Sequence, residues 1–179
     1  MPRALVIVDI QNDYFPGGLH PLDGPEAAAA NAGRLLAAFR QSGEPVLHIQ
    51  HVWDAEDAEF MLPGTTGVEI HASVAPAAGE PVIQKAHPNS FLATPLEAEL
   101  RARDVEHVVV CGMMTSMCVD ATVRAAVDLG FEASVAHDAC ATCDLEFGGE
   151  QISAPQVHGA FLAALGDGYA TVSATDDLL

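Results

Sequence analysis

Short, almost continuously apolar runs alternate along the chain with longer amphipathic stretches. Runs of this length are typical of strands that are buried on both faces of a parallel sheet. They predict strands at residues 4–8, 45–49, 81–83, 107–111, 133–136 and 169–172. Each run is too short to form an independent helix, so a sheet is the simplest structure that accommodates all of them.

Four stretches between these runs have apolar residues on one helical face, at residues 25–40, 95–103, 116–129 and 153–165. Glycines at the expected ends of three of them, Gly43, Gly130 and Gly166, are typical helix stop signals. Alternating strands and helices indicate an α/β protein. We therefore expect one domain over residues 1–179, a three-layer α/β/α sandwich around a doubly wound parallel sheet of about six strands.

Two segments interrupt this alternation. Residues 51–80 contain Pro63, Gly64, Gly67, Pro76 and Gly79, and residues 138–151 contain Gly148 and Gly149. Long irregular connections in a small domain commonly form binding loops or lids. We therefore expect both segments to lie near a functional site.

Composition narrows the classes of function. The chain has 25 acidic and 7 basic residues and a formal net charge of −18, with no Lys/Arg patch, so binding to nucleic acids or anionic membranes is not expected. No apolar stretch approaches the roughly 20 residues of a membrane helix. The chain starts with a strand rather than a signal sequence, which predicts a cytoplasmic protein whose four cysteines are reduced thiols.

Cys118 is the first candidate for chemistry. It follows a buried strand, a turn at Gly112 to Met114, and Thr115 or Ser116, either of which could cap a helix. If Thr115 is the cap, Cys118 is the third helical residue, where free N–H groups and the helix dipole favour a thiolate nucleophile. The same N–H groups could hold an oxyanion. By its position alone, Cys118 fits a buried structural cysteine equally well.

Asp9 and Lys85 each end another predicted strand. The carboxyl ends of parallel strands form the edge where open α/β sheets bind ligands, so both should converge with Cys118. Asp9 could take the thiol proton, and Lys85 could orient Asp9 and favour the thiolate. The alternatives are a loop-capping aspartate and a solvated surface lysine, but Lys85 is the only lysine in the chain.

The residues around these three positions resemble a known family. Val8-Asp9-Ile10-Gln11-Asn12-Asp13, the Lys85 segment with Asn89-Ser90-Phe91, and Cys111-Gly112-Met113-Met114-Thr115-Ser116-Met117-Cys118-Val119 are similar to the signature segments of the isochorismatase-like cysteine hydrolases. Further similar pieces are Leu62-Pro63-Gly64-Thr65, Glu69-Ile70-His71 and Asp138-Ala139-Cys140, so the resemblance covers nearly the whole chain.

The resemblance implies a set of roles. Cys118 would be the nucleophile, Asp9 the general base and Lys85 the residue that supports both. A cis peptide bond would join Met113 and Met114, and the N–H groups of Met114 and Cys118 would form the oxyanion hole. The reaction would hydrolyse a C–N amide bond of a small molecule, such as a carboxamide, ureido, carbamoyl or lactam bond, through a thioester and without a cofactor. The alternatives are a vinyl ether hydrolase of the isochorismatase type, a nicotinamidase and a catalytically silent binding or assembly module.

Large and polar side chains in the loops suggest a pocket. Those expected to contact the substrate are Tyr14, Phe15, His51, Trp53, Phe60 and Phe91. They suggest a small, largely apolar pocket for a small amide. The resemblance also implies a homodimer or homotetramer, with a small-molecule amide as the other partner.

A metal site is not predicted. The nicotinamidase branch carries an Asp-x-His pair, but the matching region here reads His48-Ile49-Gln50-His51. A zinc site from His48, His51 and His71 would lack a recognised ligand spacing. Cys140-Ala141-Thr142-Cys143 has CxxC spacing, yet no second pair at a zinc-site distance accompanies it, so we interpret these cysteines as loop residues.

Overall fold

The computed structural model describes residues 1–179 and contains a parallel sheet of six strands in the order β3-β2-β1-β4-β5-β8. The strands are β1 (Arg3–Val8), β2 (Val46–His51), β3 (Val82–Lys85), β4 (His107–Met113), β5 (Glu132–Ala141) and β8 (Thr171–Ser173). The chain runs outward from β1 to β3, then returns to the other side of β1 with β4. This reversal confirms the predicted doubly wound parallel sheet.

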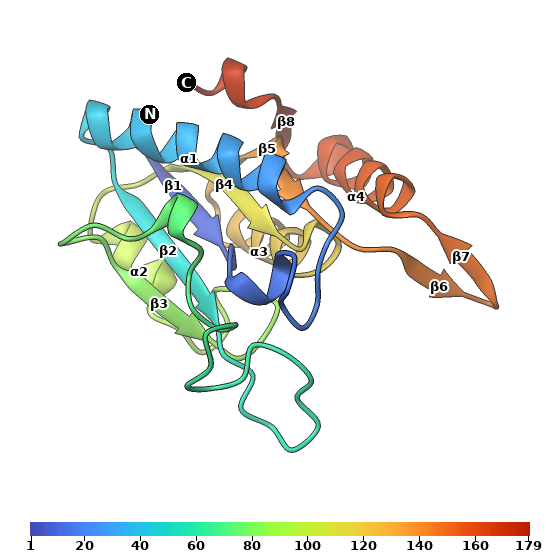
Figure 1. Ribbon diagram of the computed structural model, residues 1–179. Coiled ribbons are helices and arrows are strands. Elements are labelled where there is room, and N and C mark those ends of the chain that lie inside the picture. The colour runs from blue at the N-terminus through green and yellow to red at the C-terminus, as the bar shows by residue number, and fades with distance from the viewer.

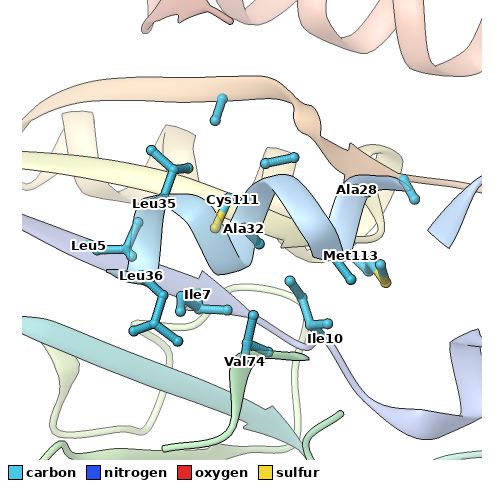
Figure 2. Close-up of a cluster of buried hydrophobic side chains, with 14 of the residues drawn as sticks. Leu5, Ile7, Ile10, Ala28, Ala32, Leu35, Leu36, Val74, Cys111 and Met113 are labelled. Carbon is cyan, nitrogen blue, oxygen red and sulfur yellow. The ribbon is translucent and has the colours of Figure 1, made fainter. Parts of the chain in front are cut away.

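Helices cover both faces of the sheet (Figure 1). They are α1 (Pro25–Ser42), α2 (Leu96–Arg101), α3 (Asp120–Asp128) and α4 (Ala154–Gly168). On one face, α1 packs its Ala32, Leu35 and Leu36 against Leu5 and Ile7 of β1 (Figure 2). Side chains of α2, α3 and α4 form a second buried cluster with the alternate residues of the strands. The predicted three-layer sandwich is therefore confirmed.

Some local predictions were wrong. Residues 138–151 are not irregular, because β5 continues to Ala141 and is followed by a hairpin of β6 (Leu145–Phe147) and β7 (Glu150–Ile152). Gly148 and Gly149 have φ of 63° and 83°, which suits a two-residue hairpin turn. The hairpin projects from the body of the molecule (Figure 1). The last helix also continues past Gly166 to Gly168.

The helix predicted at residues 116–129 is divided. A π-helical turn, η3 (Thr115–Val119), precedes α3 and contains Cys118. Gly112, near the end of β4, has a φ of 136°, and a Cβ atom there would lie 1.9 Å from the carbonyl oxygen of Val8. Only glycine therefore lets β4 approach β1 this closely just before the turn that carries Cys118.

Residues 52–81 connect β2 to β3 with little regular structure. They include one short 3₁₀ helix, η2 (Ala72–Val74), and an isolated bridge between Gln11 and Ile70. No helix of the protein has both the length and the apolar character needed to cross a membrane.

Candidate active site

Four side chains meet at the carboxyl edge of the sheet. Asp9 directly follows β1, His51 ends β2, Lys85 ends β3, and Cys118 lies in η3 beyond β4. These four strands are consecutive in the sheet, and His51 and Lys85 are paired in the β2–β3 register. Topology thus brings together residues that are separated by more than 100 positions in the sequence.

Lys85 is the centre of this cluster. Its Nζ lies 2.6 Å from Oδ2 of Asp9, and it donates to Sγ of Cys118 at 3.2 Å and to Nδ1 of His51 at 2.9 Å. The side chains of Lys85 and Asp9 are fully buried. Burial by itself lowers the pKa of Lys85, but the neighbouring Asp9 and Cys118 together hold that pKa above its usual value. Lys85 is therefore a charged ammonium with three partners.

Asp9 is the carboxylate of this cluster. Its backbone is in the left-handed region, with a φ of 51°, which turns the chain at the end of β1. The ion pair with Lys85 engages Oδ2, and a carboxylate oxygen has more lone pairs than this one contact uses, so Asp9 keeps the capacity to accept a further proton or hydrogen bond. The Cys118 sulfur and a carboxylate oxygen of Asp9 lie within 4.8 Å of each other.

The surroundings of Cys118 favour the neutral thiol over the thiolate. Burial is the largest influence and raises its pKa, the Asp9 carboxylate raises it further, and Lys85 only partly opposes them. The expectation that a capped helix start lowers this pKa was wrong. Thr115 bonds to His158 and Ser116 to Thr142, so neither side chain caps the turn.

The backbone before Cys118 has the expected geometry, because the peptide bond between Met113 and Met114 is cis. The Met114 carbonyl accepts hydrogen bonds from the N–H groups of Met117 and Val119, whereas the Met114 N–H has no acceptor within the chain. This N–H group is thus available to a ligand beside Cys118.

Gln11 fixes His51 in place. The Gln11 side chain accepts from the His51 N–H at 2.8 Å and donates to the His51 carbonyl at 2.9 Å and the Val68 carbonyl at 2.7 Å. An ammonium has no lone pair, so the His51 Nδ1 that faces Lys85 must be the acceptor, and the proton of the neutral ring is on Nε2. Burial first and Lys85 second lower the pKa of His51 to about 4.

A cavity of about 290 Å³ opens in front of Cys118. It is lined by Tyr14, His51, Trp53, Phe60, Ala86, Pro88, Met114, Met117 and Cys118. Phe60 meets Trp53 edge-to-face at 5.3 Å and stacks on His20 at 4.5 Å, which makes one wall aromatic. Burial raises the pKa of Tyr14 well above its usual value, so its hydroxyl is neutral.

Two of the expected pocket residues lie elsewhere. Phe15 is buried and stacks on His71 with ring centroids 3.8 Å apart. Phe91 packs on Phe131, at 6.1 Å, in the cluster on the other face of the sheet. In both cases the phenylalanine side chain packs against another ring, away from the cavity wall.

Metal ligands do not converge at the histidines considered from the sequence. His48 contacts Glu80 at 2.8 Å, His71 contacts Ser73, and His51 contacts Lys85, so each ring has a different partner. Donor atoms of Asp9, His51 and Cys118 do lie within 4.8 Å of one another. A metal ion there would compete with the Lys85 ammonium for all three donors, so this set does not fit a resident cation.

The cysteines of the CxxC segment have separate surroundings. Cys140 is buried in β5, next to Gly112, and Cys143 is half-buried with Sγ 3.8 Å from Sδ of Met114. Both are free thiols. Cys143 therefore packs behind a cavity residue and does not form a second reactive site with Cys140.

Sequence reasoning missed two residues that position the site. Besides Gln11, Asp13 is buried and accepts hydrogen bonds from the N–H groups of Met61 and Leu19 at 2.7 and 3.1 Å. Gly67 packs so closely that a Cβ there would lie 2.1 Å from Asp13. The polar run Gln11-Asn12-Asp13, shortly after Asp9, could have indicated these roles. Polar side chains that become buried beside a site need hydrogen-bond partners, which nearby backbone groups commonly provide.

Comparison with known proteins agrees with this geometry. The family model of the isochorismatase domain matches residues 3–176. YddQ of Bacillus subtilis, an uncharacterised isochorismatase family protein, is 50% identical over 100% of this chain and 99% of its own. The ureidoacrylate amidohydrolase RutB of Variovorax paradoxus is 29% identical over 87% of this chain and 73% of its own.

A solved structure gives the same result. An isochorismatase hydrolase from Oleispira antarctica superposes with a TM-score of 0.95 and 49% identity, over 99% of this chain and 95% of that one. The match therefore includes every strand that contributes to the cluster of Asp9, Lys85 and Cys118. The chain belongs to the isochorismatase family of hydrolases.

Proposed function

We propose that the protein is a cysteine hydrolase that cleaves a C–N amide bond in a small molecule. The observation that carries this proposal is the contact of one buried ammonium with both a carboxylate and a thiol. Lys85 Nζ lies 2.6 Å from Asp9 and 3.2 Å from Cys118, at the floor of a cavity. The amidohydrolase activity of a relative supports the same bond type.

The first half-reaction transfers the acyl group to sulfur. Asp9 takes the proton of Cys118 as the sulfur attacks the amide carbon, so a neutral thiol becomes nucleophilic only when substrate is present. The Met114 and Cys118 N–H groups receive the negative charge of the carbonyl oxygen. The C–N bond then breaks, and the leaving amine takes the proton from Asp9.

The second half-reaction regenerates the enzyme. Asp9, again a carboxylate, accepts a proton from a water molecule as that water attacks the thioester carbon. The C–S bond breaks, the sulfur regains its proton from Asp9, and the acid product leaves. Lys85 stays protonated throughout and offsets the charge that moves between Asp9 and Cys118.

Substitution of the nucleophile tests the proposal. Hydrolysis of small carboxamides and ureido compounds, followed by ammonia release, and of lactams, followed by appearance of the ring-opened amino acid, should fall about 10³-fold or more in Cys118→Ala. Mass spectrometry of the native protein, quenched with acid during turnover, should reveal an acyl group on Cys118. Full amidase activity in Cys118→Ala would contradict the scheme. Turnover of isochorismate by the same variant would instead favour a hydrolase of the vinyl ether type, whose reaction needs no sulfur nucleophile.

A further inference from the structure

The cavity in front of Cys118 has no charged wall. Apart from the reacting thiol and apolar groups, its lining includes three side chains with polar atoms, the Tyr14 hydroxyl, the His51 ring and the Trp53 indole. None is charged near pH 7, because burial raises the pKa of Tyr14 and lowers that of His51 to about 4, and the indole does not ionise. A bound molecule therefore meets aromatic carbon, thioether sulfur and uncharged polar groups.

The cations of the chain are all committed elsewhere. Each arginine pairs with an acidic side chain, and none lines the cavity. The pairs are Arg3–Glu44, Arg34–Asp176, Arg40–Glu80, Arg101–Glu97, Arg103–Glu99 and Arg124–Asp120. Lys85 is the only other cation among the side chains, and its ammonium is fully buried against Asp9, Cys118 and His51.

An anionic substituent would therefore be strongly disfavoured in this cavity. A carboxylate that enters an apolar cavity loses its hydration, and an ion pair is the usual compensation. Here the only nearby cation is Lys85, which is already neutralised by Asp9 beneath the cavity, and a further buried carboxylate, Asp13, acts on the cavity residue Tyr14. The net charge of −18 over the whole chain adds a repulsive field for anions that approach.

His51 supplies a directed contact of the opposite kind. Its Nδ1 is occupied by Lys85 and its backbone is held by Gln11, so the ring cannot turn to accept from a ligand. Nε2–H has no acceptor within the chain, and the ring lines the cavity. The side chain is thus fixed as a neutral donor for an acceptor atom such as a carbonyl oxygen, an ether oxygen or a ring nitrogen.

We infer that the substrate of this site is a small amide without a carboxylate or other anionic group, whose acceptor atom faces Nε2–H of His51. This inference rests on the proposed amide hydrolysis and specifies its substrate class. It separates the protein from any hydrolase that binds its substrate by a carboxylate. It also disfavours isochorismate, a dicarboxylate, as the substrate of the vinyl ether alternative.

A matched pair of ligands tests the inference by binding alone. The probes are 4-nitrobenzamide and the anion of 4-carboxybenzamide, which have nearly the same shape but differ in charge. With Cys118→Ala, which prevents turnover, calorimetry should give a dissociation constant at least about 10-fold higher for the carboxylated amide. Equal or tighter binding of the carboxylated amide, or no binding of the nitro compound, would overturn the inference.

A cation placed at the cavity rim gives the complementary test. Met117 is 46% exposed and lines the cavity, so Met117→Arg in the same background should strengthen binding of the carboxylated amide about 10-fold or more. Phe147→Arg in the same background is the matched control. Phe147 is 82% exposed on the projecting hairpin, so this substitution adds the same charge away from the site. If both variants bound the carboxylated amide more tightly by the same factor, the gain would come from the net charge of the protein and not from the cavity, which would contradict the inference.

Turnover by the native protein separates this inference from the proposed function. Selective binding of the neutral amide with no Cys118-dependent ammonia release from any amide would refute the hydrolase scheme and leave the charge selectivity standing. Equal ammonia release from both members of the pair would support the hydrolase scheme and refute the selectivity.

Discussion

Lys85 and His51 end neighbouring strands in register, and the lysine Nζ donates to the histidine Nδ1 at 2.9 Å. This contact joins the Asp9–Lys85 ion pair to the wall of the cavity, because the His51 ring lines the cavity and its Nε2 has no acceptor within the chain. The proton position on His51 is therefore set by the same ammonium that contacts Cys118. The residues proposed to react with the substrate and the residue proposed to bind it therefore belong to one hydrogen-bonded cluster.

The tautomer of His51 is directly measurable. In a protein labelled with ¹⁵N at histidine, the His51 ring should show a protonated Nε2 and an unprotonated Nδ1, and it should stay neutral down to about pH 4. An Nδ1–H tautomer would show that Lys85 does not donate to this ring, and a titration near the usual pKa of about 6.5 would contradict the burial of the ring. Lys85→Met should abolish the tautomer preference.

The same shift predicts a pH dependence of stability. The pKa of His51 is lower in the folded protein than in the unfolded chain, so between about pH 6.5 and about pH 4 the unfolded chain binds the proton first. The His51 contribution to the free energy of unfolding should therefore decrease as the pH falls through this window and stay constant above it. Urea denaturation of the native protein and His51→Phe at pH 7 and pH 5 measures the contribution, which should be absent from the variant.

The Asp9–Lys85 pair should dominate the stability of the site. Lys85→Met leaves the Asp9 carboxylate buried without a counterion, which should lower the free energy of unfolding by about 3–5 kcal/mol. The double variant Asp9→Asn/Lys85→Met should recover part of that loss, although it should remain inactive. Additive losses in the two single variants, measured by urea denaturation, would contradict a coupled pair.

The Cys118 thiol should react slowly in the absence of substrate. Because burial raises its pKa, alkylation by iodoacetamide should accelerate only above the ordinary thiol pKa of about 8.5. Peptide mapping should detect Cys143, which is half-buried, before the fully buried Cys111 and Cys140. Rapid alkylation of Cys118 at pH 6 would indicate a resting thiolate and contradict the activation by substrate that we propose.

Gly112 should tolerate no side chain. Gly112→Ala would place a Cβ 1.9 Å from the Val8 carbonyl oxygen, which should cost more than about 4 kcal/mol, within the range of severe overpacking. Gly130→Ala is the matched control, because Gly130 also has a positive φ of 87° but open space around its Cα. The control should lose only about 1–2 kcal/mol from backbone strain. Similar unfolding midpoints for the two variants would refute a role for the β1–β4 contact.

The sequence predicted the fold and the central cluster well. Parallel strands bury both faces, so their apolar runs are visible without tertiary information, and residues that end such strands must converge at one edge. Asp9, Lys85 and Cys118 could be grouped in this way. The sheet order, which places β1 beside β4 and one strand away from β3, agreed with the expected doubly wound arrangement.

Other features depend on tertiary packing and were beyond the sequence. The pKa of Cys118 follows from how deeply the thiol is buried, which a helix-start argument cannot reveal. Phe15 and Phe91 are large aromatic residues of the kind that often line pockets, but each packs against another ring instead. The contact between His51 and Lys85 depends on the β2–β3 register, which an apolar run alone does not fix.

The burial of the only lysine also gives the protein a built-in reporter. Amine-reactive acylating reagents find no ammonium among the exposed side chains, because Lys85 is fully buried and engaged with three partners. Acylation of Lys85 then requires the site to open far enough to release it. The rate at which this lysine gains mass in such a reagent therefore measures how often the buried cluster of Asp9, Lys85 and Cys118 becomes exposed, and a ligand that fills the cavity should slow it.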